Sequence, residues 1–305
     1  MTTDTSPAPA VGIFLATITL GNPWAPTAEA VLTAMDAAAA AGCTEVGLSL
    51  PAVGALSAAG HRAAAELSRR GLGVACLEAM FQWSTSDDAA RAEATQIVAV
   101  ADEVGSQRVM AVEMAATFAD HDLARHRLAL ANEIVAGAGR QLVVEFLPWS
   151  AIPDLATAWS LVAPLDGAAI LLDTWHWTRQ PGGPDLDLLA RIPGERIGLV
   201  QLCDTHAEVA RGDAEGELDV MTTDVMTADV TTADVMTTDL MTEAMTGRTD
   251  PGEGTVDFAA LTTVLARTGS RAPALAEVFD PARLEADGPA RRAARTIDAC
   301  RSVWR

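Results

Sequence analysis

The sequence predicts an α/β fold consisting of a single (β/α)8 TIM barrel with a low-complexity insertion after its seventh strand. Short β-rich runs alternate with longer Ala/Leu-rich stretches of helical period from Val11 onward, and eight such pairs are present. This alternation is typical of a parallel sheet with crossover helices. A chain of 305 residues has the usual length of one barrel. We expect the barrel to span residues 11–305 and residues 1–10 to be a disordered N-terminus.

The elements follow one another in a regular order. We expect the strands at 11–18, 44–50, 73–80, 108–114, 141–147, 168–173, 197–203 and 274–278. We expect the helices to start near Thr27, Ser57, Asp87, Asp122, Asp154, Pro184, Asp257 and Arg283. Several starts carry Thr, Ser or Asp before the apolar periodicity, as N-caps do, and several stretches end at a glycine such as Gly105.

One segment interrupts this order. A short unit of Val or Leu, Met, Thr, Thr or Ala, and Asp repeats between Asp219 and Met245. We therefore expect residues 212–247 to form a low-complexity inserted loop, because the region is rich in acids and buries little. The alternative is a short solvent-exposed helix or a lid, since an insertion after strand 7 lies at the catalytic face of a barrel.

Composition excludes several functional classes. All 21 basic residues are Arg, and neither Lys nor Tyr occurs. A Schiff-base lysine, a P-loop lysine and a tyrosine general acid are therefore absent. The formal net charge of −20 repels phosphodiester backbones, so we do not expect nucleic acid as a partner. Cys43, Cys76, Cys203 and Cys300 lie far apart and are expected to be buried small hydrophobes.

The chain also lacks the signals of a membrane or secreted protein. Its apolar runs are short, whereas a membrane span needs 18 or more consecutive apolar residues. Residues 1–10 have no basic stretch followed by an apolar core, as a secretory signal would. We therefore expect a cytoplasmic protein that acts on a small-molecule substrate. Association into a homo-oligomer is left open.

Four polar residues lie where predicted strands end, in otherwise apolar sequence: Glu145, Asp173, Gln201 and Glu277. Carboxyl ends of barrel strands converge on one mouth, and an unpaired charge there is costly. Three carboxylates brought together need a cation, and oxygen ligands favour Mg²⁺ or Mn²⁺, with Co²⁺ or Zn²⁺ able to substitute. The alternative is that each residue is satisfied separately by a helix N-terminus or an Arg partner.

The order of these residues carries a resemblance. The segments Leu172-Asp-Thr-Trp-His176 and Val200-Gln-Leu-Cys-Asp204 precede Arg248 and the Pro251-Gly-Glu-Gly254 turn, and Glu277 follows. This set resembles the xylose isomerase-like TIM-barrel superfamily of sugar phosphate isomerases and epimerases over nearly the whole chain. The resemblance implies a metal held by Glu145, Asp173, Gln201 and Glu277, with His176 and Arg248 contacting substrate. The repetitive insertion before Arg248 departs from the short loop of the family.

The resemblance also bears on the reaction. Many sugar epimerases of this type carry His at the position of Gln201, whereas Gln resembles hydroxypyruvate isomerases and 3-dehydroshikimate dehydratases. Metal binding to a substrate carbonyl and adjacent hydroxyl acidifies the neighbouring C–H by stabilising an enediolate. One of Glu145 and Glu277 is expected to remove that proton and the other to return one. His176 is expected to protonate a substrate oxygen; the alternative is a hydrogen-bonded strand-end histidine.

Several tryptophans are candidates for contact with the substrate. Trp149 and Trp175, with Trp24, Trp83 and Trp177, follow predicted strands, so they either face a sugar ring at the mouth or pack loops onto the barrel. We assign Trp149 and Trp175 to substrate binding, and Glu78 and Glu113 remain further candidate contacts. The leading function is a metal-dependent isomerase or epimerase, and the alternative is a lyase. An abasic-site endonuclease, which needs a basic groove and more histidines, and a non-catalytic barrel are disfavoured.

Overall fold

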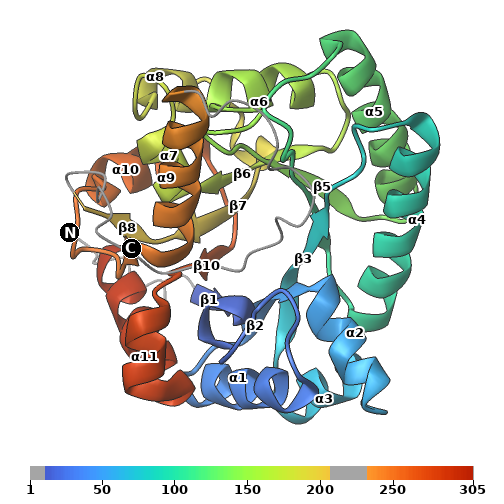
Figure 1. Cartoon of the computed structure of the whole chain (residues 1–305). Helices are drawn as coiled ribbons and strands as arrows, with labels where there is room; N and C mark the ends of the chain where they lie inside the picture. Colours follow the sequence, from blue (N-terminus) through green and yellow to red (C-terminus); the bar gives the residue numbers. More distant parts are fainter. Residues whose placement is uncertain (1–10, 207–231, 305) are drawn as a thin grey trace, which may run out of the picture.

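A computed structural model describes residues 11–206 and 232–304. The expected disordered segment 1–10, and the part of the expected insertion from 212 to 231, lie outside these residues. Eight parallel strands close into a barrel in the order β1-β10-β7-β6-β5-β4-β3-β2, and helices surround it (Figure 1). The predicted (β/α)8 barrel is confirmed.

The barrel strands match the predicted order but are shorter at several ends. They are β1 (Val11–Phe14), β2 (Glu45–Ser49), β3 (Gly73–Met80), β4 (Arg108–Ala111), β5 (Gln141–Glu145), β6 (Ala169–Asp173), β7 (Ile197–Leu202) and β10 (Ala274–Ala276). A two-stranded antiparallel ribbon of β8 (Asp204–Thr205) and β9 (Arg248–Thr249) stands beside them. The expected first strand ends early because residues 15–18 turn into the 3-10 helix η1 (Leu15–Ile18).

The helices fill the connections between strands. They are α1 (Ala28–Ala40), α2 (Leu50–Ala58), α3 (Ala63–Arg69), α4 (Asp87–Val104), α5 (His121–Gly137), α6 (Leu155–Val162), α7 (Thr174–Arg179), α8 (Leu186–Leu189), α9 (Thr232–Thr246), α10 (Phe258–Thr268) and α11 (Pro281–Val303), with the 3-10 turn η2 (Gly194–Arg196) before β7. Thr27, Asp154 and Asp257 are side-chain N-caps, as their sequence positions predict.

The helix expected near Ser57 begins earlier. Helix α2 starts directly after β2, because Ser49 accepts a hydrogen bond from the backbone N–H of Ala52 and Pro51 occupies its first turn. A separate helix, α3, then completes the crossover to β3. The starting point at Ser57 is therefore wrong, and the cap that sets the true start is the last residue of the strand.

The expected inserted loop also differs from the structure. Residues 232–246 of the segment 212–247 form helix α9 rather than a loop. Leu240 and Ala244, one helical turn apart, pack against Trp175, Cys203 and Val278 at the end of the barrel. The acid-rich repeat indicated little burial, but its apolar positions fall on one face at this spacing and bury there.

The core has two parts. A large apolar layer lies between the strands and the surrounding helices, and a smaller one fills the barrel, with Cys76, Val143, Leu171, Leu199 and Leu275 among its residues. All four cysteines are buried and unpaired, which confirms the expectation. Among residues 11–206 and 232–304, none of the helices combines the length and the apolar character that crossing a bilayer takes.

Candidate active site

The four strand-end residues singled out by the sequence are all buried at the carboxyl end of the barrel. Glu145 and Asp173 are the last residues of β5 and β6, Gln201 lies in β7, and Glu277 directly follows β10. Parallel neighbours in the barrel pair Asp173 with Gln201 in register. The barrel therefore carries three carboxylates and one amide to the same end.

Asp173 is held from two sides. It caps helix α7, and its Oδ1 accepts hydrogen bonds from the backbone N–H groups of Trp175 (2.8 Å) and His176 (2.9 Å). Its Oδ2 accepts one from Nη1 of Arg248 at 2.6 Å. Burial opposes ionisation, but Arg248 and His176 outweigh it, so the pKa of Asp173 lies below its ordinary value. Asp173 is thus an ionised carboxylate in the interior.

Arg248, on β9, is the cation of this site. Its Nη1 also donates to the backbone oxygen of Glu277 (3.1 Å) and lies 3.7 Å from Oε2 of that residue, while its Nε donates to the backbone oxygen of Ala244 in α9 (2.7 Å). The rings of Trp175 and Phe279 lie 5.8 and 5.6 Å from its guanidinium carbon. Strand β9, which follows the insertion, therefore places the positively charged side chain of Arg248 next to the acids at the strand ends.

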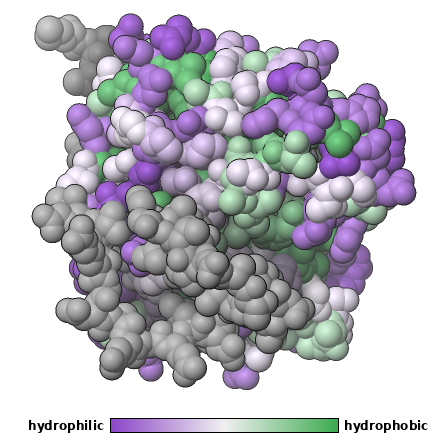
Figure 2. Space-filling model, turned by 45° about the horizontal axis from the view of Figure 1, so that its top comes forward, coloured by the Kyte–Doolittle hydropathy of each residue, from purple (hydrophilic) through white to green (hydrophobic). Residues whose placement is uncertain are grey.

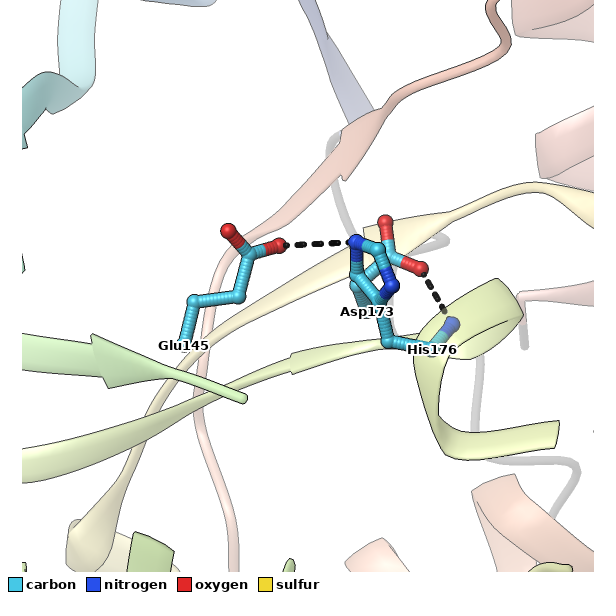
Figure 3. Close-up of side chains that lie close together, drawn as sticks. All are labelled: Glu145, Asp173 and His176. Atoms are coloured by element: carbon cyan, nitrogen blue, oxygen red, sulfur yellow. Dashed lines mark hydrogen bonds and ion pairs between the residues drawn. The ribbon is translucent and has the colours of Figure 1, made fainter. Parts of the chain in front are cut away.

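His176 lies in α7, three residues after Asp173, and faces Glu145 (Figure 3). Its Nε2 is 3.6 Å from Oε1 of Glu145 and accepts a hydrogen bond from Nη2 of Arg248 at 3.2 Å. Because a guanidinium only donates, Nε2 carries no proton in this arrangement. Burial lowers the pKa of His176 to about 3. The imidazole is therefore neutral, and its Nδ1 has no partner among the described residues.

The glutamates of the site resist ionisation. Burial, reinforced by the charge of Asp173, raises the pKa of Glu145 to about 8. Burial also raises the pKa of Glu277 well above its usual range, although Arg248 opposes the shift. A further glutamate that the sequence left as a candidate substrate contact, Glu78 of β3, is equally buried, and its pKa is raised by burial and then by Glu145.

These residues fit a bound cation. Glu145, Asp173 and His176 each offer one ligand atom within 4.8 Å of the others, and all three are buried. Gln201 Oε1 and Glu277 Oε2 are buried and have no hydrogen-bond partner among the described residues. Four buried acidic side chains, counting Glu78, share the charge of Arg248, so a bound cation would stabilise their ionised forms. The sequence did not foresee His176 as a ligand candidate, because a spacing of three residues after Asp173 does not reveal its approach to Glu145.

Asp204, the last residue of the second quoted motif, has a structural task. Its carboxylate accepts hydrogen bonds from the backbone N–H groups of Thr205, Gly252, Gly254 and Val256. A Cβ at Gly254 would lie 2.4 Å from Oδ1 of Asp204, so only glycine fits this close approach. The Pro-Gly-Glu-Gly turn is thereby fixed onto β8, next to Arg248 on the paired strand.

The tryptophans divide between packing and the mouth. Trp83 and Trp177 are buried in the layer between barrel and helices, where Nε1 of Trp83 donates to Val112 (2.9 Å). Trp175 is also fully buried, and its ring stands edge-on to His176 at 5.2 Å. Trp149 is half-buried, 5.3 Å from the His176 ring, and Trp24 lies beside Phe279. Substrate contact by Trp149 and Trp175 stays a prediction.

Apolar side chains also line part of the outer face. Figure 2 shows hydrophobic groups gathered between hydrophilic ones on the side that it presents. The large hydrophobic residues that remain exposed in the described part of the chain are Leu20, Phe81, Met114 and Leu123. Leu20, Phe81 and Met114 follow β1, β3 and β4, so they lie toward the end of the barrel at which the carboxylates gather.

Comparison with protein families gives one match. The model of the xylose isomerase-like TIM barrel family covers residues 35–302. Comparison with the curated proteins finds no match in sequence.

Several solved structures have the same fold. One is a xylose isomerase-like TIM barrel/4-hydroxyphenylpyruvate dioxygenase fusion protein, with a TM-score of 0.71, 18% identity, and 95% of this chain aligned to 42% of the fusion protein. The chain thus spans less than half of that relative. The IOLI protein with a bound zinc atom has a TM-score of 0.70 and 15% identity, with 96% of each chain covered. D-allulose 3-epimerase from Methylomonas sp., in complex with D-allulose, has a TM-score of 0.67 and 14% identity, with 98% of each chain covered.

Proposed function

Because the chain belongs to the xylose isomerase-like TIM barrel family, we propose that it is a divalent-metal-dependent isomerase or epimerase of small hydroxy-carbonyl substrates of the sugar or polyol type. The observation that carries the proposal is the cluster of buried acids at the carboxyl end of the barrel. The ligand atoms of Glu145, Asp173 and His176 lie within 4.8 Å of one another, close enough to bind one ion. Arg248 contacts both Asp173 and Glu277. Enzymes of this fold place their chemistry at this end.

Glu145, Asp173, Gln201 and Glu277 would hold the metal, with His176 as a further donor. Oxygen donors in this number favour Mg²⁺ or Mn²⁺, and the histidine makes Co²⁺ or Zn²⁺ suitable substitutes. A zinc atom in the IOLI protein supports a metal on this scaffold. When bound, the cation supplies Lewis-acid polarisation of a substrate carbonyl.

Glu145 and Glu277 would carry the proton transfers. A carboxylate placed beside the substrate takes a proton and, as the carboxylic acid, gives one back. One of the two removes the proton from the carbon next to the carbonyl, and the other returns a proton to the neighbouring carbon or to the opposite face. Neutral His176, 3.6 Å from Glu145, would hydrogen-bond a substrate oxygen.

The alternative is a metal-dependent lyase such as a 3-dehydroshikimate dehydratase-like enzyme. Its first step is the same proton abstraction, after which a β-hydroxyl leaves as water. The observation that bears on it is Gln201, which resembles such dehydratases, and also hydroxypyruvate isomerases, rather than the epimerases that carry His at this position. Either reaction takes a small molecule, and the net charge of −20 supports such a substrate over nucleic acid in a cytoplasmic setting.

The test is metal analysis of the wild-type, Glu277→Ala and Glu66→Ala proteins, followed by incubation with Mn²⁺ and a panel of ketoses, hydroxypyruvate and 3-dehydroshikimate. Glu66 is the matched control because it is also a buried glutamate, yet it lies in the surrounding helix α3, where it pairs with Arg70. We expect stoichiometric metal in the wild type and the control and its loss in Glu277→Ala. The product then separates isomerisation from dehydration. Wild-type protein without metal would refute the proposal.

A further inference from the structure

Glu78 meets Gln201 across the interior of the barrel. Glu78 lies near the end of β3 and Gln201 in β7, strands that do not neighbour each other in the barrel. Nε2 of Gln201 donates to Oε1 of Glu78 at 3.2 Å, and both side chains are buried. Among the described residues, this is the hydrogen bond that the side-chain amide of Gln201 makes.

The bond decides which end of the amide faces the site. Oε1 of Glu78 accepts from the NH2 group of Gln201, so in this arrangement Glu78 holds the NH2 end of the amide. The carbonyl oxygen is then turned away from Glu78, and it is buried without a partner among the described residues. An amide NH2 group cannot bind a cation, whereas the carbonyl oxygen can.

We propose that Glu78 is a positioning residue that orients Gln201 so that its Oε1 faces the bound metal. The inference rests on the proposed function, which makes Gln201 a ligand. Glu78 uses its Oε1 to accept the bond from the amide of Gln201. It acts through the amide: without it, the side chain of Gln201 is free to present either end.

Measured Mn²⁺ affinity tests this role independently of turnover. Partners that orient a metal ligand typically contribute about 10- to 100-fold in affinity. We therefore expect Glu78→Met, read by the electron paramagnetic resonance signal of free Mn²⁺, to bind Mn²⁺ about 10- to 100-fold more weakly. Glu78→Gln keeps an acceptor oxygen at the same place and should stay within a few-fold of wild type. Glu66→Met replaces a buried glutamate of helix α3 and is the control, so its Mn²⁺ affinity should not change.

The Gln201→Ala background separates the competing explanations. If Glu78 acts through the amide, adding Glu78→Met to Gln201→Ala costs no further affinity. A further loss there would make Glu78 a direct ligand and overturn the inference. A loss of ten-fold or more in Glu78→Gln would assign its effect to charge and overturn it as well, and this variant decides alone should Glu78→Met not fold. Wild-type protein that binds no Mn²⁺ would instead refute the proposed function.

Discussion

Arg248 and Asp173 form a buried ion pair that joins the segment after the insertion to the barrel. Nη1 of Arg248 lies 2.6 Å from Oδ2 of Asp173, and their side chains are 3% and 0% exposed. The other carboxylate oxygen caps helix α7. One aspartate thus fixes the helix that carries His176 and the ribbon that carries Arg248, so both side chains have defined positions relative to the strand-end acids.

Removing the guanidinium should unfold the protein more easily. Arg248→Met leaves Asp173 and Glu277 buried without their cation, and breaking such a pair costs about 3 to 5 kcal/mol. We expect a loss of this size in the free energy of unfolding, measured by urea denaturation in the absence of divalent metal. Arg291→Met is the control, because Arg291 is largely exposed and its pair with Asp287 at the surface contributes less than about 1 kcal/mol. Equal stability of the two variants would contradict the assigned role of Arg248.

The carboxylate of Asp204 should be irreplaceable by an amide. Asparagine offers one acceptor oxygen, and its NH2 group would face some of the four backbone N–H groups that Asp204 now satisfies. A lost hydrogen bond to a charged group costs about 1.5 to 3 kcal/mol. We expect Asp204→Asn to lower the thermal unfolding midpoint clearly, whereas the exposed cap variant Asp257→Asn lowers it little. A midpoint equal to that of Asp257→Asn would refute the anchoring role.

Local signals determine most of the barrel. Short β-rich runs between stretches of helical period located every barrel strand, because both faces of a parallel strand are buried and read as apolar runs. The N-caps Thr27, Asp154 and Asp257 were predictable for the same local reason. Helices α2 and α9 were not, since the first is capped by a strand residue and the second is stabilised by tertiary contacts of Leu240 and Ala244.

The site was predictable as a set of positions but not as a set of contacts. Polar residues in apolar strand ends pointed to Glu145, Asp173, Gln201 and Glu277, because burial of such groups needs a reason. The bond from Gln201 to Glu78 joins residues 123 positions apart. No local pattern marks a partner on a strand across the barrel, and such pairs emerge only when the barrel closes.

Stability in the absence of metal should fall as pH rises from 6.5 to 8. The pKa of Glu145 is raised from its ordinary 4.5 to about 8, so the folded protein holds a proton there that the unfolded chain has released. Unfolding is then favoured by rising pH, at up to about 1.4 kcal/mol per pH unit for one proton. His176, whose pKa is lowered to about 3, has the opposite effect, but only below its ordinary value of 6.5.

Urea denaturation at pH 6.5 and pH 8 measures this slope. Glu78 and Glu277 shift in the same direction and add to it. Glu145→Gln should reduce the slope, because the amide does not titrate, and Mn²⁺ should reduce it in the wild type by holding the carboxylates ionised. A wild-type stability that is constant or rises between these pH values would contradict the assignment.

Helix α9 should depend on one ion pair for its attachment to the barrel. Nη2 of Arg179, in α7, lies 2.5 Å from Oε1 of Glu243, which also accepts a hydrogen bond from Thr205. Glu243 is buried, so Glu243→Gln removes the charge that holds Arg179 and weakens the contact between the two helices. We expect several-fold faster hydrogen exchange in peptides covering 239–246, measured by mass spectrometry, with unchanged exchange in β5 and β6.

The control is Asp239→Asn, an exposed substitution in the same helix, which should leave the exchange rates unchanged. If both variants exchange alike, α9 is attached by Leu240, Ala244 and the bond from Arg248 to the backbone of Ala244 rather than by Glu243.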